Sequence, residues 1–131
     1  MYPDDTILEC SCVKPGTTTA GRISCAQSTV LGDAWGVALK YATAGAPERI
    51  PVMLHGIVKM TTGGSSATTV TAGKGVMNSI TTTVHATADV GTYTDANNAM
   101  FIGASHTLGM ALHTAGAIAG DEVLIHVGHS L

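Results

Sequence analysis

The chain of 131 residues has the length of one ordinary domain. Charged residues make up 11% of it and aromatic residues 4%, whereas a typical soluble domain is about 25% charged. The net charge of −3 and the scattered basic residues argue against a nucleic-acid partner, because such partners select clustered Lys and Arg. No apolar run reaches the roughly 18 residues of a membrane span, so we expect no membrane partner either.

Small side chains dominate the composition, with 19 Thr, 18 Ala and 16 Gly. A core with few large rings buries little apolar area, and burial contributes about 25 cal/mol per Å². We therefore expect an isolated monomer to be marginally stable, which favours an oligomer or a larger assembly. The odd number of cysteines, three, fits a reducing compartment better than a disulfide scaffold. The acidic start of the chain lacks the basic region of a signal peptide, so we expect a cytosolic protein.

Alternation of side chains and β-branched residues predict four strands in the first half of the chain, at residues 6–13, 23–30, 36–44 and 50–61. The alanine-rich residues 36–44 also suit a helix, but their short length between glycines favours a strand. In the first strand, alternation places Leu8, Cys10 and Cys12 on one face. A turn is predicted at residues 14–16, because proline presets φ and glycine tolerates positive φ. Gly56 interrupts the last strand and predicts a bulge or a bend there.

The second half of the chain begins with a Thr-, Ser- and Gly-rich stretch, residues 61–83, which predicts short strands and surface loops. Residues 84–99 contain several turn signals. Three more strands are predicted after them, at residues 100–104, 107–114 and 122–127. Turn signals at such short, regular spacing are typical of an all-β barrel or sandwich.

One segment of the first half is repeated 73 positions later. The tetrapeptide GVAL at residues 36–39 matches GMAL at residues 109–112. Each is followed by an alanine-rich stretch, an Ala-Gly turn, an acidic residue and a β-branched strand. Two copies of strand, turn and strand predict a duplicated hairpin inside one pseudo-symmetric domain, because a solenoid would need at least three repeats.

The residue types that carry chemistry form no catalytic pattern, so we predict no catalytic, cofactor-binding or metal-binding residues. Cys10, Cys12 and Cys25 lack the usual spacing of a zinc site and are better explained as small buried apolar residues. The six histidines show no H-E-x-x-H pattern. The sequence Gly73-Lys74-Gly75 lacks the flanking residues of a phosphate-binding loop and is predicted to be a turn.

Two features are candidates for contacts with partners. Trp35 is the only tryptophan, and it is either a core anchor or a residue of an oligomer interface, where tryptophan is enriched. The first residues are either a frayed terminus or an arm that becomes ordered by adding a strand to a partner.

The repeated segments resemble the head decoration, or capsid cement, proteins of tailed bacteriophages. The similar stretches are GVALKYATAG and IPVMLHGIVKM, within residues 36–60, and LGMALHTAGAIAGDEVLIHVGHSL, residues 108–131. Such proteins typically end in a Gly-x-Ala-Leu strand, an Ala-rich stretch, an Ala-Gly-Asp turn and a hydrophobic strand. The two segments cover somewhat over a third of the chain, and residues 61–99 have no distinctive match.

The resemblance implies an all-β, compact β-barrel or β-clip fold, β-tulip-like, with an extended N-terminal arm and the duplicated strand–turn–strand unit. Residues 1–131 would be a single decoration domain, with the arm and first strands in residues 1–30 and the barrel body in residues 31–131. The protein would be a homotrimer, without enzymatic activity or cofactor, on three-fold positions of the expanded capsid. Its partner would be the major capsid protein, contacted through Met1, Tyr2, Pro3, Asp4, Asp5 and Thr6.

The resemblance further implies assembly in the cytoplasm of a bacterial host and a final location on the capsid exterior, where the protein would stabilise the head against internal DNA pressure. One alternative is another all-β virion component, such as a tail, fibre or adhesin module, which would have a similar composition. A second alternative is a small metal-binding or enzymatic domain built on Cys10, Cys12 and a histidine.

Overall fold

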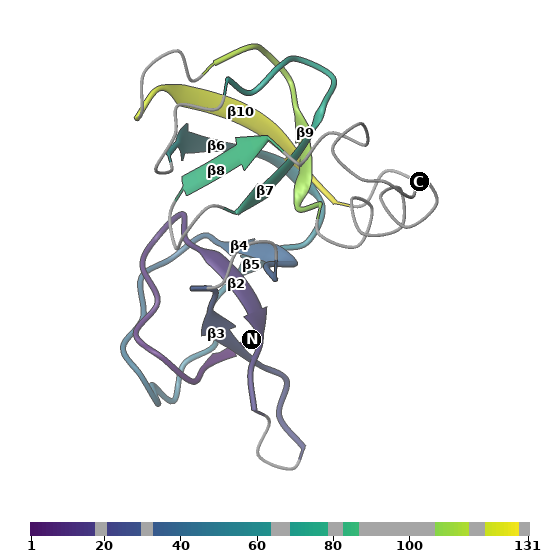
Figure 1. Ribbon diagram of the computed structural model, residues 1–131. Helices are drawn as coiled ribbons and strands as arrows, with labels where there is room; N and C mark the ends of the chain where they lie inside the picture. Colours follow the sequence, from purple (N-terminus) through teal and green to yellow (C-terminus); the bar gives the residue numbers. More distant parts are fainter. Residues whose placement is uncertain are drawn as a thin grey trace.

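The computed structural model describes residues 1–17, 21–29, 33–63, 69–78, 83–86, 107–115 and 120–128 (Figure 1). These residues form strands and no helix, which confirms the predicted all-β fold. The strands are β1 (Tyr2–Pro3), β2 (Cys12–Pro15), β3 (Ser24–Gln27), β4 (Gly36–Ala38), β5 (Val52–Met53), β6 (Gly56–Thr62), β7 (Gly75–Asn78), β8 (Thr83–Ala86), β9 (Gly109–Ala111) and β10 (Glu122–Val127).

The first five strands form a sheet in the order β1-β3-β2-β4-β5, which we call the first unit. β1 runs parallel to β3, and the other neighbours are antiparallel. The sheet curls so that the start of β1 meets the residues before β5. There, Ile50 and Met1 exchange two hydrogen bonds of 2.8 Å each. The Gly45 amide also donates to the Pro3 carbonyl (3.0 Å), so the first sheet is closed by these few hydrogen bonds.

The last five strands form a closed barrel in the order β10-β6-β8-β7-β9, which we call the second unit. β6 and β8 are parallel, and the remaining pairs are antiparallel. Six successive residue pairs join β10 to β6, from Glu122↔Thr61 to Val127↔Gly56. Figure 1 shows this barrel stacked on one end of the first unit.

The two units repeat one hydrogen-bonding framework strand by strand. The pair Ala38↔Val52 of the first unit has its counterpart in Ala111↔Ile125 of the second. Both residues are shifted by 73 positions, as the repeat in the sequence predicted. The equivalence also extends beyond the predicted hairpin. Corresponding pairs of the two units are Cys12↔Val37 and Gly75↔Met110, Pro15↔Cys25 and Asn78↔Val84, Tyr2↔Ser24 and Thr61↔Thr83, and the isolated bridges Ile7↔Ala42 and Val70↔Ala115. The repeat is thus a whole five-stranded unit.

The glycine that opens each repeated tetrapeptide lies where the facing strand passes closest. A side chain at Gly109 would overlap the carbonyl of His126, and one at Gly36 would lie 2.9 Å from the carbonyl oxygen of Met53. Met53 and His126 are themselves counterparts in the repeat. The repeated Gly-x-Ala-Leu pattern is therefore a packing requirement of both hairpins.

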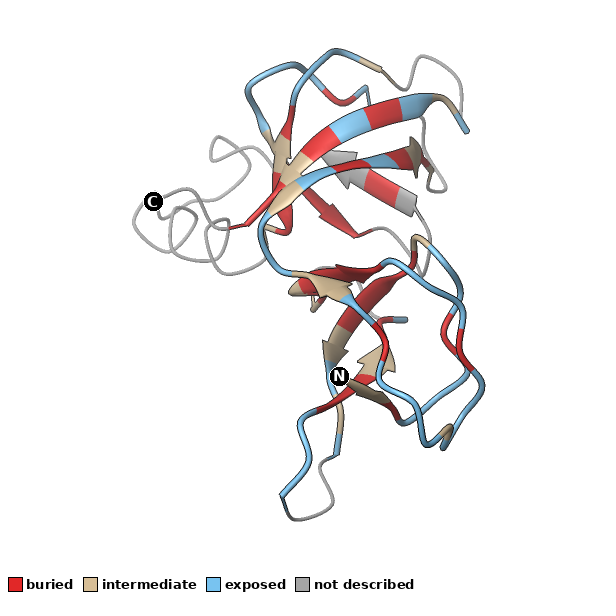
Figure 2. Ribbon diagram, turned by 180° about the vertical axis from the view of Figure 1, so that it is seen from behind, coloured by how far each residue is buried: buried red, intermediate tan, exposed pale blue. Residues whose placement is uncertain are grey.

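Each unit has its own apolar core, and the two cores consist mainly of valine, isoleucine and alanine. The core of the second unit also includes Cys12, Ala34 and Val37 from the first unit, so the two units pack against each other. Figure 2 shows the buried residues along the inner faces of both units. A buried polar chain strengthens this junction: Asn78 donates to the Ser28 hydroxyl (3.0 Å) and accepts from the Ala34 amide (3.2 Å).

The strand predicted at residues 6–13 is wrong over most of its length. Ile7 forms only a single bridge, and the chain then turns through Cys10, whose φ is 59°. The Ser11 hydroxyl donates to the Leu8 carbonyl (2.7 Å), which stabilises the turn and separates the faces of Cys10 and Cys12. β2 starts only at Cys12 and continues through Pro15, where a turn was predicted.

Other strands are also shorter than predicted, because each strand ends where its sheet curls. β4 ends at Ala38 instead of residue 44, and residues 50–61 are divided into β5 and β6 at the bend predicted beside Gly56, whose φ is 143°. The predicted strand at residues 122–127 is confirmed as β10. Residues 100–104 lie outside the described residues.

The first residues do not project as an extended arm. Tyr2 and Pro3 form β1, which pairs with Ser24 and Cys25 of β3. The N-terminal segment is thereby part of the first sheet, because its backbone groups find partners there. The assignment of residues 1–131 to a single domain stays a prediction.

Candidate binding site at the N-terminal strand

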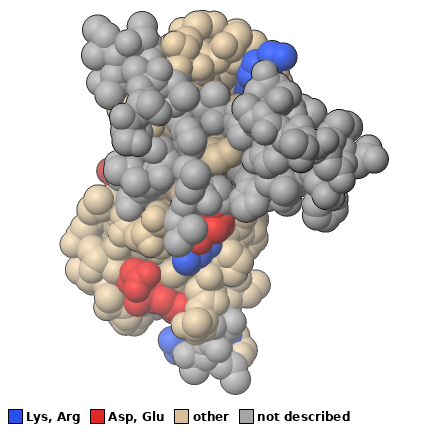
Figure 3. Space-filling view, viewed as in Figure 1, with Lys and Arg blue, Asp and Glu red and all other residues tan. Residues whose placement is uncertain are grey.

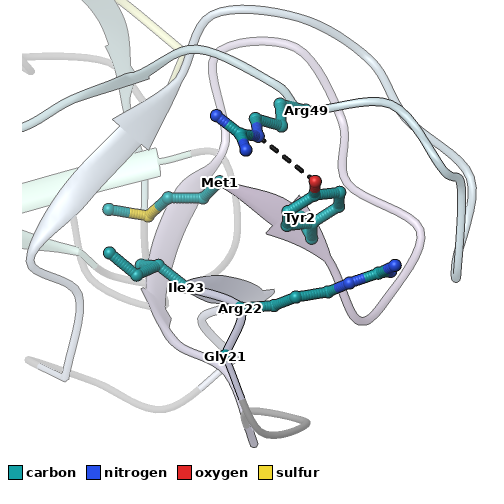
Figure 4. A pocket seen from close by; sticks show the side chains of 6 residues that line it. All are labelled: Met1, Tyr2, Gly21, Arg22, Ile23 and Arg49. Carbon is teal, nitrogen blue, oxygen red and sulfur yellow. Dashed lines mark hydrogen bonds between the residues drawn. The ribbon is translucent and has the colours of Figure 1, made fainter.

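The N-terminal strand forms one wall of an open pocket of about 440 Å³. The pocket is lined by Met1, Tyr2, Gly21, Arg22, Ile23 and Arg49 (Figure 4). These residues come from three separate segments of the chain: β1, the turn before β3, and the loop before β5. They meet because β1 pairs with β3 on one side and reaches Ile50 on the other.

The Tyr2 ring lies between two guanidinium groups, as Figure 4 shows. The Cζ atom of Arg22 is 4.8 Å from the ring centroid and that of Arg49 is 5.4 Å from it, so both are within cation–π range. Arg49 Nε also donates a hydrogen bond to the Tyr2 hydroxyl (3.2 Å). This bond and the positive charge lower the pKa of Tyr2, and the same bond raises the pKa of Arg49.

Neither arginine of the pocket has a carboxylate partner among the residues that the structure describes. The ion pairs in those residues are Lys14–Asp33, Lys40–Glu48 and Lys59–Glu122. Ile23 lies beside the arginines and is 70% exposed. A carboxylate or phosphate next to an apolar group is the ligand chemistry that such a surface complements.

Backbone and side-chain hydrogen bonds hold the N-terminal segment in place. The Tyr2 amide donates to the Ile23 carbonyl (3.0 Å), and the Asp4 amide donates to the Cys25 carbonyl (2.9 Å). The Ser24 hydroxyl donates to the Asp4 carboxylate (2.9 Å). The pocket wall is therefore preorganised, which lowers the entropy cost of binding.

The structure divides the six residues predicted to contact a partner into two groups. Met1 and Tyr2 line the pocket, Pro3 is buried in β1, and Asp4 is bound to Ser24. Asp5 and Thr6 are exposed in the segment that follows. Sequence reasoning missed Arg22, Ile23 and Arg49, because no local pattern marks them and only strand pairing brings them together.

Trp35, the other predicted contact residue, is half-buried beside β4. Its amide donates to the Val13 carbonyl (3.0 Å), as that of its counterpart Leu108 donates to the Val76 carbonyl (2.8 Å). Leu108 is fully buried. The indole Nε1 of Trp35 is buried and has no hydrogen-bond partner among the described residues, so this side chain fits its site less completely than Leu108 does.

The cysteines and histidines are dispersed in the described part of the chain, where no three His, Cys, Asp or Glu side chains form a metal-binding group. Cys12 and Cys25 are buried, and desolvation raises the pKa of Cys12 to about 12. The rings of His55 and His126 meet edge to face with centroids 4.7 Å apart. The predicted turn at Gly73 is confirmed, with φ of 77°.

Charged groups are sparse on the described surface in Figure 3, where uncharged residues cover most of the area. Within the described ranges, no helix has the length and hydropathy that a membrane crossing requires. No family model matches the chain, and no curated protein matches its sequence.

Proposed function

We propose that this protein is a virion protein that decorates the outer surface of the expanded capsid of a tailed bacteriophage. In this proposal it assembles in the bacterial cytoplasm, binds the major capsid protein as a homotrimer at three-fold positions, and stabilises the head against internal DNA pressure. The observation that carries the proposal is the register of the two resembling segments. Their shared Gly-x-Ala-Leu strands occupy equivalent positions in two equivalent hairpins, β4–β5 and β9–β10.

The pocket supplies the contact to the shell in this proposal. Arg22 and Arg49 would face acidic side chains of the capsid protein, and the exposed Ile23 would add apolar area beside them. Charged contacts at the edge of an interface mainly raise the association rate, and salt weakens them. A preorganised pocket with two cations that have no carboxylate partner among the described residues is suited to such a contact.

Stabilisation of the head would follow from mass action. A protein that binds the expanded shell, and not its separate subunits, shifts the equilibrium toward the intact shell. Three linked contacts in a trimer strengthen binding by about 10²–10⁴-fold over one contact, provided that all three sites are reached together.

The test is co-sedimentation with expanded, undecorated heads of the phage that encodes the chain, combined with light scattering of the free protein. We expect a trimer of about 40 kDa from the 13.2 kDa chain, binding to heads, and a higher rupture temperature of decorated heads. Failure to bind heads, or an unchanged rupture temperature, would contradict the proposal. A monomer that binds heads would contradict only the trimer.

The contribution of the pocket is tested with a charge-matched pair of variants. Arg22→Gln with Arg49→Gln removes two positive charges from the pocket, and Lys40→Gln with Lys74→Gln removes two positive charges elsewhere. We expect the first pair to weaken head binding about tenfold and the second to change it little. Equal effects of both pairs would show that general charge, and not the pocket, controls binding.

A tail, fibre or adhesin module remains the second candidate, because the same all-β fold with exposed apolar residues suits those roles. It predicts binding to tails or to host glycans in place of heads, in the same sedimentation assay. The metal-dependent alternative predicts bound zinc in the purified protein, and elemental analysis showing less than about 0.1 equivalent would exclude it.

A further inference from the structure

The two guanidinium groups of the pocket are separated by the ring that lies between them. Arg22 and Arg49 lie on either side of Tyr2, with their Cζ atoms 4.8 Å and 5.4 Å from its ring centroid (Figure 4). A carboxylate binds a guanidinium group best in the plane of that group, through two parallel hydrogen bonds. One carboxylate therefore cannot form such a pair with both arginines, whereas two carboxylates can.

Each guanidinium group keeps hydrogen-bond donors for a ligand. Arg49 uses Nε for the Tyr2 hydroxyl, and its two Nη groups have no partner among the described residues. Arg22 contacts the face of the ring and, in the same part of the chain, forms no ion pair. Both arginines are exposed, so a ligand can reach them from solvent. The pocket thus offers two separate places for a carboxylate.

The separation of these two places matches the repeat of an extended peptide. In an extended segment, residues two positions apart point to the same side, and their Cα atoms are about 7 Å apart. Asp or Glu side chains at such positions can pass on either side of the Tyr2 ring. Acidic residues that are adjacent in an extended segment point to opposite sides, so only one of them reaches the pocket.

An apolar side chain lies beside the two cations. Ile23 follows Arg22 directly and is 70% exposed. An aliphatic residue of the ligand, two positions from an acidic residue, points to the same side and can cover Ile23. Burial of this pair would add apolar contact to the two ion pairs.

We propose that the pocket recognises an extended segment of a partner protein with the pattern acidic–x–acidic, flanked two positions away by an aliphatic residue. One carboxylate would pair with Arg22 and the other with Arg49, and the aliphatic residue would cover Ile23. The inference names the partner segment for the contact in the proposed function, and it rests on that function for the identity of the partner as the capsid protein.

The chain itself has no segment with this pattern. Its nine acidic residues include two adjacent pairs, Asp4 with Asp5 and Asp121 with Glu122, and no two of the nine are two positions apart. Outside the described residues the only acidic residues are Asp89 and Asp95, which are six positions apart. Neither the chain nor a second copy therefore supplies the two carboxylates, whereas a different protein can.

A nucleic acid fits the pocket less well than an acidic peptide. The chain has a net charge of −3, and no other basic residue lines the pocket. Nucleic-acid sites gain most of their affinity from several clustered cations. The exposed Ile23 adds apolar surface, which a phosphate backbone does not match.

The test uses two peptides of identical composition with the full chain. The probe is acetylated, amidated Val-Thr-Glu-Thr-Glu-Thr-Val, and the control is Val-Thr-Glu-Glu-Thr-Thr-Val, whose glutamates point to opposite sides. Binding is followed by NMR from the Nε–H signals of Arg22 and Arg49, the only arginines of the chain. We expect the probe to shift both signals and to bind about three- to fivefold more tightly than the control, the gain from one additional exposed ion pair.

Variants show whether the two arginines cause the difference between the peptides. Arg22→Gln and Arg49→Gln each remove one of the two places, so we expect either variant to bind the two peptides equally. Lys40→Gln removes a positive charge outside the pocket and should preserve the difference. Equal binding of the peptides by the wild-type protein, or a difference that survives both arginine variants, would overturn the proposal.

The remaining outcomes identify other ligands of the pocket. Tighter binding of a thymidine trinucleotide than of the probe would overturn the proposal in favour of a nucleic acid. Tighter binding of the probe after Asp89→Asn with Asp95→Asn would overturn it in favour of a segment of the chain itself. Capsids are absent from this experiment, so its failure overturns the acidic–x–acidic motif alone. Heads left unbound in the sedimentation assay would instead overturn the proposed function and not the peptide preference.

Discussion

The first and second units show how one backbone framework is completed in two ways. The second unit closes through the full length of β6, with six residue pairs to β10. The first unit closes through the pair of Met1 with Ile50 and the hydrogen bond from the Gly45 amide to the Pro3 carbonyl. Hydrogen-bond register is therefore shared, whereas the coverage of the core is not. The comparison teaches that the same strand register can carry a longer closing strand pair, and more packing with it, in one unit than in the other.

The glycines at the hairpin crossings provide the largest expected effect. Gly109→Ala forces the His126 carbonyl and the whole of β10 to move, so we expect a loss of about 3 kcal/mol of unfolding free energy. Gly36→Ala meets the Met53 carbonyl at 2.9 Å together with side-chain ends of Val52 and Leu54, so we expect about 1–2 kcal/mol. Urea denaturation measures both. Equal losses would show that the first unit is packed as rigidly as the second.

A pair of valines measures the difference in core coverage. Val123→Ala in β10 removes two buried methyl groups, and we expect it to cost about 2–3 kcal/mol. Val52→Ala in β5 acts on a half-buried side chain, and we expect about 1 kcal/mol. The measurement is again the free energy of unfolding in urea. A cost at Val52 as large as that at Val123 would show that the two side chains are covered equally well.

The buried Asn78 joins the two units, whereas its counterpart in the first unit, Pro15, has no side-chain polar group. Asn78→Ala leaves the Ala34 amide without its acceptor and the Ser28 hydroxyl without its donor. We expect a loss of about 1–3 kcal/mol and a broader thermal transition as the units unfold less cooperatively. Calorimetry tests this result. A sharp transition at an unchanged midpoint would show that apolar packing alone joins the units.

The turns before β2 and β7 each contain one residue with positive φ, but the residue type differs. Gly73 adopts φ of 77° without strain, whereas its counterpart Cys10 adopts 59° with a side chain. Cys10→Gly relieves that strain but increases the entropy of the unfolded chain, so we expect a net gain of about 0.5–1 kcal/mol. Gly73→Ala is the reciprocal variant, with an expected loss of similar size. Destabilisation by Cys10→Gly would show that the Cys10 side chain contributes packing in the turn.

The smallest effect is expected at the exposed pocket of the first unit. Because Arg49 lowers the pKa of Tyr2, ultraviolet titration should show one phenol ionising earlier in the wild-type protein than in Arg49→Gln. A pKa that is lower in the folded state means that ionisation of Tyr2 favours folding, and this contribution appears as pH rises toward and above about 10. Superimposable titration curves would contradict the Tyr2–Arg49 hydrogen bond.

The periodic features of the sequence were predictable because they depend on neighbours in the chain. Glu122–Val127 alternates buried and exposed residues, and it folds as the predicted strand. The repeat of Gly36 to Leu39 at Gly109 to Leu112 predicted two equivalent hairpins. The strand predicted at residues 6–13 failed because Cys10 turns the chain, a conformation that the residue type does not indicate.

The candidate site was predictable only in part. Met1 and Tyr2 were expected to contact a partner, and they line the pocket. Arg22, Ile23 and Arg49 are too far apart in the sequence to form a pattern. They come together because β1 pairs with β3 while Met1 meets Ile50 at the closure of the sheet.

The sequence by itself determined the all-β class and the duplicated hairpin, since side-chain alternation and glycine placement act within a few residues. Only the tertiary structure decided that the duplication extends to a whole five-stranded unit, because strand pairing joins residues that are distant in the chain. Val52 and Ile125 occupy equivalent hairpins, and within the described ranges only Ile125 also pairs with a strand from elsewhere in the chain, because β6 lies beside β10.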